Sequence, residues 1–313
     1  MNRFILCFTF LFALSAQLFA QDKTDKLLDK IDAAENKGDY AAVVNYSSEL
    51  IKLYPENNAP YLIRGKAYTK LREYDLATKD LDKALKLKVD CETYYYRSYC
   101  FSLMGKSDKA IADANKVFQL CGDTSDYALS TYINRGSAKL HKRDYQGAYD
   151  DYMLAYALDT TNFETIFALG SICDEVGKDS LSLAYLNRAY LIDSTNSDLI
   201  NNMGFFYLDR GDYKKAAHYM NRALQLDKEN PLAWNNLGYC KYKLGDYNGA
   251  MSDINHSMKL YPSNSYAWRN RALVYLALNN KTAACSDMEK AMSLGYSTQY
   301  GYDVQELYNK NCK

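Results

Sequence analysis

Along residues 231–264, apolar and small side chains recur every three or four positions on both sides of a short polar turn. The turn is Gly245–Tyr247, with the sequence Gly-Asp-Tyr. The recurring residues are Trp234, Leu237, Gly238 and Tyr242 before it, and Ala250, Ile254, Ser257 and Leu260 after it. This spacing is the period of an α-helix with one apolar face, and a Gly-Asp pair marks a break between helices. The stretch therefore predicts two short amphipathic helices joined by a tight turn.

The same pattern continues through nearly all of the chain, mostly in steps of 34 residues. The repeats span 24–57, 58–90, 91–128, 129–162, 163–196, 197–230, 231–264 and 265–298. The third repeat carries an insertion near Ser125–Ala128, and the register is uninterrupted from 129 to 298. A single hairpin cannot bury its apolar face alone, so we expect neighbouring repeats of the 21–298 array to stack.

The repeat resembles the tetratricopeptide repeat (TPR), whose pattern of Trp, Leu-Gly, Tyr, Ala and Pro is matched at Trp234, Leu237–Gly238, Tyr242, Ala250 and Pro262. The resemblance implies an all-α fold, a right-handed α-solenoid of about eight helix-turn-helix repeats. The small residues stand where the two helices of a repeat cross, and large residues, including the seventh of each repeat, are expected to fill the space around them.

The last residues, 299–313, depart from the repeat pattern. We expect a C-terminal capping helix that starts with Asp303 as its cap and runs to about Lys310. Tyr302, Val304 and Leu307 are expected to face the last repeat and so cover the apolar end of the array.

The N-terminus has the features of a signal peptide over residues 1–20, with Arg3 before an apolar stretch and Ala20 at its end. The alternative is that this segment is retained as a membrane anchor. No later stretch is long and apolar enough to span a membrane. We therefore expect an exported protein, in the periplasm, outside the cell or on its surface.

Composition and motifs give no sign of catalysis. The chain has 38 Lys+Arg and 38 Asp+Glu, a balance that provides no basic surface for nucleic acid or for a membrane. His141, His218 and His256 fall in different repeats and at different positions. No phosphate-binding loop, metalloprotease motif or nucleophile motif occurs. We expect no enzyme activity, no cofactor and no metal site.

The cysteines divide into pairs and single residues. In an antiparallel hairpin, residues equally far from the turn lie side by side, and Cys91 and Cys121 are equally far from Lys106. Cys285 and Cys312 are likewise symmetric about 298–299. Export permits disulfides, so each pair is either a disulfide or two free thiols. Of the others, Cys7 lies in the signal segment, and the expected buried thiols are Cys100, Cys173 and Cys240.

The resemblance implies that the first helices of the repeats line a concave groove. An asparagine ladder that hydrogen-bonds a peptide backbone is one interpretation of Asn134, Asn202, Asn236 and Asn270, and ordinary repeat filler is the other. The other groove candidates are Tyr95, Tyr99, Phe167, Tyr239 and Arg269. For the early tyrosines, packing against the second repeat is the alternative. A predicted acidic part of the groove comprises Glu164, Asp174, Glu175, Asp198 and Asp209.

These features favour a non-enzymatic interaction scaffold of the cell envelope that binds an extended peptide segment, with a basic residue, from another protein. The alternatives are a self-associating structural module, with a homo-oligomer as its form, and a glycan- or peptidoglycan-binding module. The C-terminal repeat and the Leu-Phe-Ala-Gln segment at 18–21 resemble those of exported TPR proteins from Bacteroidetes-type bacteria, a likeness that implies no defined activity.

Overall fold

The computed structural model describes residues 21–297 and 301–313. The expected signal peptide and the junction at 298–300 lie outside the described residues. All regular structure among the described residues is helical, which confirms the all-α prediction. The chain divides into two compact units, Met1–Thr160 (unit 1) and Thr161–Lys313 (unit 2), which we describe separately.

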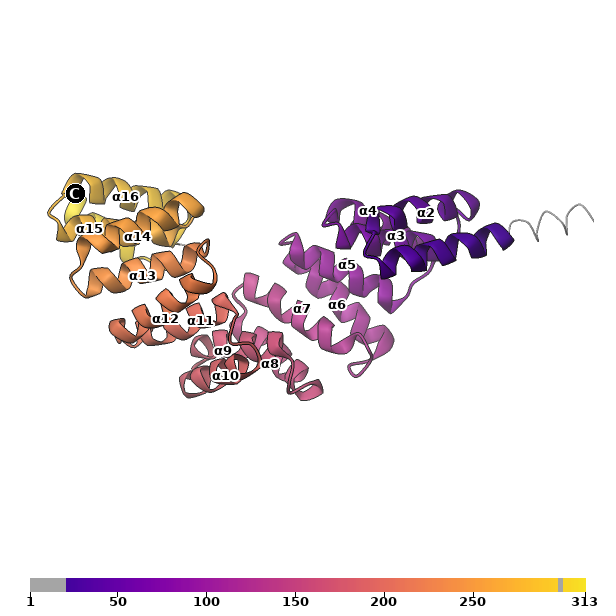
Figure 1. Ribbon diagram of the computed structural model, residues 1–313, viewed down its shortest axis with the longest axis horizontal. Coiled ribbons are helices and arrows are strands. Elements are labelled where there is room, and N and C mark those ends of the chain that lie inside the picture. The colour runs from indigo at the N-terminus through magenta and orange to yellow at the C-terminus, as the bar shows by residue number, and fades with distance from the viewer. Residues whose placement is uncertain (1–20, 298–300) are drawn as a thin grey trace, which may run out of the picture. The chain divides into compact units, whose positions relative to one another are not determined.

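Unit 1 begins with a helical stretch over residues 21–36. The helices that follow are α2 (Tyr40–Leu53), α3 (Asn58–Lys70), α4 (Tyr74–Leu87), α5 (Cys91–Leu103), α6 (Ser107–Cys121), α7 (Ala128–His141) and α8 (Tyr145–Leu158). Successive helices pack against each other as hairpins, α3 on α4, α5 on α6 and α7 on α8 (Figure 1).

Unit 2 has the same hairpin arrangement (Figure 1). Its elements are α9 (Phe163–Ile172), a 3-10 turn η1 (Asp174–Val176), α10 (Asp179–Ile192), α11 (Ser197–Asp209), α12 (Tyr213–Leu226), α13 (Pro231–Lys243), α14 (Tyr247–Leu260), α15 (Ser265–Ala277), α16 (Lys281–Ser293) and α18 (Asp303–Cys312).

The sequence sets the ends of these helices through caps and glycines. Asn230 and Asp246 precede α13 and α14, and each side chain accepts hydrogen bonds from backbone N–H groups of the first turn. Gly245 begins the turn after α13 at φ +88°, in the left-handed region that glycine tolerates best. Inside α13, a Cβ on Gly238 would lie 2.6 Å from Cγ1 of Ile254, so the two helices cross where the repeat pattern predicts.

The seventh position departs from its expected role as apolar filler in four of the repeats, whereas Leu169, Met203 and Leu237 keep that role as buried residues. In four repeats it is an arginine whose Nε and Nη2 donate to both oxygens of an aspartate sixteen residues later on the second helix. These pairs are Arg64–Asp80, Arg97–Asp113, Arg135–Asp151 and Arg271–Asp287. The recurrence of Arg and Asp sixteen residues apart can be seen in the sequence. The pattern of apolar positions alone does not reveal it, because both residues are charged.

The same arginines also connect neighbouring repeats. Nη1 of each one donates to a side chain on the second helix of the preceding repeat. The acceptors are Ser48, Asp82, Asn115 and Asn255. A planar guanidinium presents donors in a fixed fork, so one side chain holds three helices in register.

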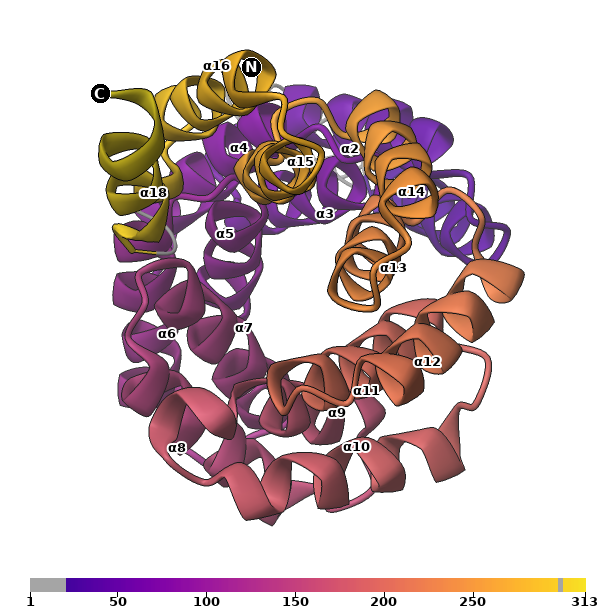
Figure 2. The same cartoon turned by 90° about the vertical axis from the view of Figure 1, so that its left-hand side faces the viewer.

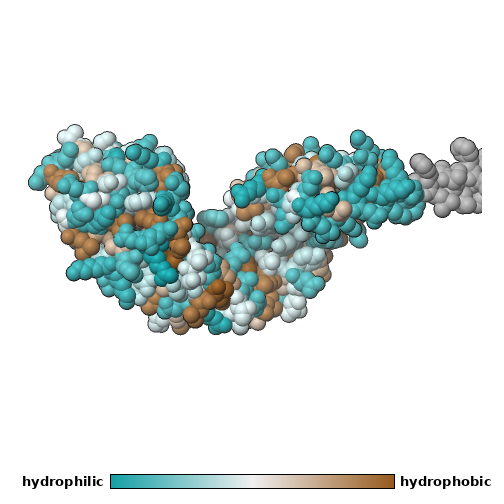
Figure 3. Space-filling view, in the orientation of Figure 1, coloured by the Kyte–Doolittle hydropathy of each residue, from teal (hydrophilic) through white to brown (hydrophobic). Residues whose placement is uncertain are grey.

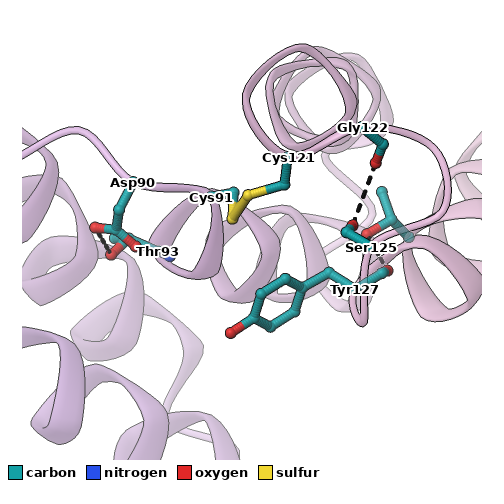
Figure 4. The surroundings of a disulfide bond; sticks show 8 residues. Asp90, Cys91, Thr93, Cys121, Gly122, Ser125 and Tyr127 are labelled. Carbon is teal, nitrogen blue, oxygen red and sulfur yellow. Dashed lines mark hydrogen bonds between the residues drawn. A yellow bond between two sulfur atoms is a disulfide. The ribbon is translucent and has the colours of Figure 1, made fainter.

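Both cysteine pairs considered from the sequence are disulfide-bonded in the structure. Cys91 at the start of α5 joins Cys121 at the end of α6, with the ring of Tyr127 alongside (Figure 4). Cys285 on α16 joins Cys312 on α18, with their Cα atoms 5.7 Å apart. The first pair closes a hairpin before the inserted loop of unit 1, and the second fastens the C-terminal helix of unit 2.

The C-terminal helix α18 lies against α16 (Figure 2). Val304 is fully buried and Leu307 is half-buried, as expected for residues that cover the last repeat. Tyr302 is 72% exposed, so the expectation that it faces the last repeat was wrong. The expectation that Asp303 caps this helix was wrong, since Tyr302 is the N-cap and Asp303 is the first helical residue. The Asp303 carboxylate accepts hydrogen bonds from Arg269 of α15 instead.

Candidate functional site

The main hollow of unit 2 has a volume of about 610 Å³. Its wall comes mainly from α9, η1, α10, α11, α13, α15 and the start of α18, and it combines carboxylates, amides and aromatic rings. The residues on which its chemistry depends are Asp174, Glu175, Asn201, Asn202, Phe205, Phe206, Asn235, Asn236, Asn264, Arg269 and Asp303.

Two carboxylates give one part of the hollow a negative charge. Asp174 and Glu175 stand in η1, where α9 ends early, and both line the hollow. Arg210 approaches Asp174 at 3.3 Å. Glu175 is exposed and has no ion pair among the described residues. A basic side chain is therefore the ligand group that this part of the hollow would stabilise.

The other members of the predicted acidic surface lie outside the lining of this hollow. Glu164 on α9 is exposed, although burial raises the pKa of its carboxyl. Asp198 accepts a hydrogen bond from Nδ2 of Asn230. Asp209 is exposed at the end of α11. Only Asp174 and Glu175 of the five acids are thus brought together at the hollow.

The amides predicted as a ladder are mostly engaged with one another. Asn270 is 0% exposed, and its Nδ2 donates to Asn235 at 3.1 Å. Asn236 is buried and donates to Asn201 at 3.2 Å. Asn202 is half-buried and donates to Ser171, which leaves its oxygen for the hollow. The expectation that Asn270 reads a bound peptide was wrong, because packing encloses its amide.

A fifth asparagine of the hollow has an unpaired donor that sequence reasoning missed. Asn264 is 6% exposed, and its Nδ2 has no hydrogen-bond partner in the described parts of the chain. At the same place one repeat earlier, Asn230 donates to Asp198. The position that corresponds to this aspartate is Leu232, which cannot accept. The wall of the hollow therefore holds a buried donor that lacks an acceptor.

Arg269 was predicted as a groove residue, and the structure gives it a more specific setting. Its Nη2 lies 2.9 Å from Oδ2 of Asp303, and its guanidinium lies over the rings of Tyr239 and Tyr266. Arg269 and Asp303 also line a second hollow of about 450 Å³. Tyr239 belongs to this second hollow, together with Lys243.

The remaining groove candidates do not join these hollows. Phe167 on α9 stacks on Phe163. In unit 1, the ring of Tyr95 packs against Tyr96 and Tyr127, which agrees with the packing interpretation of the early tyrosines. Tyr99 on α5 is half-buried.

Asn134, the first member of the expected ladder, lies on α7 of unit 1. Its Nδ2 is buried and has no hydrogen-bond partner among the described residues.

The thiols and the potential metal-binding side chains of the described residues form no further candidate site. Cys100, Cys173 and Cys240 are buried and free, as predicted, and burial raises the pKa of each thiol. Within residues 21–297 and 301–313, no group of three or more His, Cys, Asp or Glu side chains could hold a metal ion. None of the described helices has the length and apolarity that crossing a membrane requires.

Comparison with known families supports the repeat assignment. Residues 207–269 match one tetratricopeptide repeat model, and residues 60–90 and 265–294 match another. The chain therefore contains TPR repeats, as the resemblance predicted.

Among curated proteins, the chain is similar to small glutamine-rich tetratricopeptide repeat-containing protein 2 of Saccharomyces cerevisiae. The two are 32% identical over 121 residues, which cover 37% of this chain and 30% of that protein. The chain thus spans less than a third of the length of this relative.

Among solved structures, the Cut9–Hcn1 hetero-tetramer of the APC/C matches with a TM-score of 0.66 at 18% identity, over 92% of this chain and 55% of the other. Yeast Tom70 matches with a TM-score of 0.56 at 15% identity, over 87% and 58%. At these identities the likeness shows the fold alone.

Proposed function

We propose that this protein is a non-enzymatic interaction scaffold that binds an extended segment of another protein in the main hollow of unit 2. A lysine or arginine of that segment lies beside Asp174 and Glu175. The observation that carries the proposal is the joint presence of these two carboxylates with unpaired amide groups in one hollow of about 610 Å³.

The lining suits a peptide better than a small apolar molecule. Asn202 has a free amide oxygen and Asn264 an unpaired amide nitrogen, which match the N–H and C=O groups of a main chain. Phe205 and Phe206 add apolar surface for side chains of the segment. Such a site recognises an extended backbone and one basic side chain, without requiring a defined sequence elsewhere.

The test uses fluorescein-labelled peptide libraries of equal length whose central residue is fixed as lysine, arginine, glutamate or norleucine. We expect the full-length protein to bind the lysine and arginine libraries about tenfold more tightly than the norleucine library, the effect of one charge-assisted hydrogen bond. Fluorescence anisotropy gives the affinities.

The matched variants are Asp174→Asn with Glu175→Gln, and Asp209→Asn as the control. Asp209 is an exposed acid of α11 outside the hollow, so its loss should leave the preference for lysine intact. The double variant should bind the lysine and norleucine libraries equally. If the wild type binds both libraries equally, Asp174 and Glu175 do not select a basic residue, and this part of the proposal is wrong.

We also propose export to the cell envelope. The support is the signal-like N-terminal segment and the presence of two disulfides, which persist in oxidising compartments. Fractionation of the source cells, with mass spectrometry of the N-terminal peptide, tests both the location and the cleavage. Recovery of the intact N-terminus in the cytoplasmic fraction would contradict export.

Self-association is the second candidate function, and one observation favours it. Leu191 on α10 is 86% exposed, and its neighbour Ile192 is 49% exposed. On the face drawn in Figure 3, apolar patches interrupt a mostly hydrophilic surface. If Leu191 and Ile192 join two copies of the protein, sedimentation velocity will show a mass that rises with protein concentration in the wild type. The mass of the Leu191→Asp variant should stay constant.

A further inference from the structure

A chain of side-chain hydrogen bonds runs from α15 through α13 to α11. Nη1 of Arg269 donates to Oδ1 of Asn270 at 3.0 Å, and Nδ2 of Asn270 donates to Oδ1 of Asn235 at 3.1 Å. Nδ2 of Asn235 donates to Oδ1 of Asn236 at 3.4 Å, and Nδ2 of Asn236 to Oδ1 of Asn201 at 3.2 Å. Asn270, Asn235 and Asn236 each accept through the oxygen and donate through the nitrogen, so the chain has one direction.

The direction is set where the chain begins. Arg269 donates from Nε and Nη2 to Oδ2 of Asp303, at 3.2 and 2.9 Å, and its planar group lies over the rings of Tyr239 and Tyr266. A guanidinium has donors and no acceptor, so only the oxygen of Asn270 can face it. Each later amide is then oriented by the one before it.

The far end of the chain lies at the main hollow. The oxygen of Asn201 is occupied by Asn236, and its Nδ2 has no partner among the described residues. Asn201 is therefore left with a donor for the hollow that it lines. The adjacent Asn202 donates to Ser171 and is left with an acceptor. One donor and one acceptor on α11 complement the C=O and N–H of an extended chain.

We propose that Asp303 is a positioning residue for the main hollow. Through Arg269 it orients the chain of amides, so that Asn201 offers a donor to a carbonyl oxygen of the bound segment. The C-terminal helix thereby helps to determine which main-chain group the hollow accepts, in addition to covering the last repeat. This inference rests on the proposed function, because it concerns the same hollow.

The attachment of α18 does not depend on Asp303 alone, which makes the inference testable by substitution. Val304 is fully buried in the cluster that joins α18 to α16. Tyr308 donates to Glu289 of α16, and the Cys285–Cys312 disulfide holds the far end of the helix. Asp303→Asn should therefore remove the negative charge that faces the Arg269 guanidinium, while α18 stays in place.

The first arm follows side-chain amide resonances of the ¹⁵N-labelled full-length protein without any ligand. We expect Asp303→Asn to shift the NH₂ signals of Asn270, Asn235, Asn236 and Asn201. Asp303→Glu should restore the wild-type positions. The control is Glu306→Gln, which alters an acid one turn further along α18 and should shift none of these four signals. Unchanged signals in Asp303→Asn would overturn the inference.

The second arm measures binding of the lysine library as a double-mutant cycle. Asp303→Asn and Asn201→Ala should each weaken binding about fivefold, the effect of one hydrogen bond. If Asp303 acts through Asn201, the double variant will bind no more weakly than either single variant. Additive losses would overturn the inference, because they would mean that Asp303 acts independently of the amide chain.

The two arms separate failure of this inference from failure of the proposed function. Asp303→Asn should retain the wild-type preference for lysine over norleucine, since Asp174 and Glu175 are unchanged. If no library binds the wild type, the proposed function fails. The amide resonances then still decide whether Asp303 orients Asn201.

Discussion

The two units use the same helical hairpin but hold it together differently. In unit 1, the seventh residue of three successive repeats is an arginine bonded to an aspartate of its own hairpin and to the preceding repeat. In the first three repeats of unit 2 the same position is apolar, as Leu169, Met203 and Leu237. The last repeat of unit 2 returns to arginine at Arg271.

The residue type at the seventh position affects both the stability of a repeat and the polar groups that the repeat can offer to a ligand. A buried arginine–aspartate pair specifies register but bears a desolvation cost, whereas apolar packing avoids that cost. The three apolar repeats of unit 2 supply α9, α11 and α13, which line the main hollow. There the polar groups of the first helices are asparagines directed at one another and at the hollow, such as Asn201 and Asn236. Unit 2 thus places its polar side chains where a ligand can reach some of them.

The largest expected effect is on the alkylation rates of the buried thiols, because each thiol reacts quickly only when its unit unfolds locally or globally. Burial raises the pKa of Cys240 to about 12, so its thiolate is scarce at pH 8 in the folded protein. We expect alkylation of Cys240 to be about 1,000-fold slower than in the urea-unfolded chain. We expect Cys100 of unit 1 to react before Cys240. The buried ion pairs of unit 1 bear a desolvation cost, which lowers the free energy needed to open that unit and expose the thiol.

Mass spectrometry of tryptic peptides, after timed exposure to iodoacetamide, measures each rate. The disulfide-bonded cysteines serve as internal controls, since they should not be alkylated in either state without reductant. If Cys100 is alkylated more slowly than Cys240, unit 1 is the more stable unit and the expected order of stability is wrong.

The second effect tests whether the apolar arrangement can replace the ionic one. Arg97→Met should lower the free energy of unfolding by about 3 kcal/mol, because it leaves Asp113 buried and unpaired. Arg97→Met with Asp113→Tyr introduces the residues that stand at the corresponding positions of the sixth repeat, Met203 and Tyr219, and should recover most of that loss. Urea unfolding followed by circular dichroism measures both. If the double variant is as unstable as Arg97→Met, apolar residues cannot replace the arginine–aspartate pair at these positions.

The smallest of these effects concerns helix crossing in unit 2. Gly238→Leu should lower the free energy of unfolding by about 2 kcal/mol, because a Cβ there already meets Ile254 at 2.6 Å. Ser252→Leu adds the same side chain on the exposed face of α14 and is the matched control. If Gly238→Leu unfolds at the same urea concentration as the control, the crossing does not depend on a small residue.

Much of this fold could be predicted from residue spacing. The periods of three and four, the Gly-Asp turns and the asparagine caps are local signals, and the helices begin and end close to where these signals place them. The site was predictable only in part. Asp174 and Glu175 line the hollow as expected, whereas Asn270 is enclosed and Asn264 was missed, because neither burial nor an absent acceptor can be read from one repeat.

The sequence by itself determined the helical hairpins, their turns and the repeat register, because each depends on residues close together in the chain. Only the tertiary structure decided which polar side chains remain available. Asn201 and Asn270 are the same residue type at neighbouring repeat positions, yet one lines a hollow and the other is sealed. Their difference arises from residues about one repeat away, Asn236, Asn235 and Asp303, whose contacts exist only once the repeats have stacked.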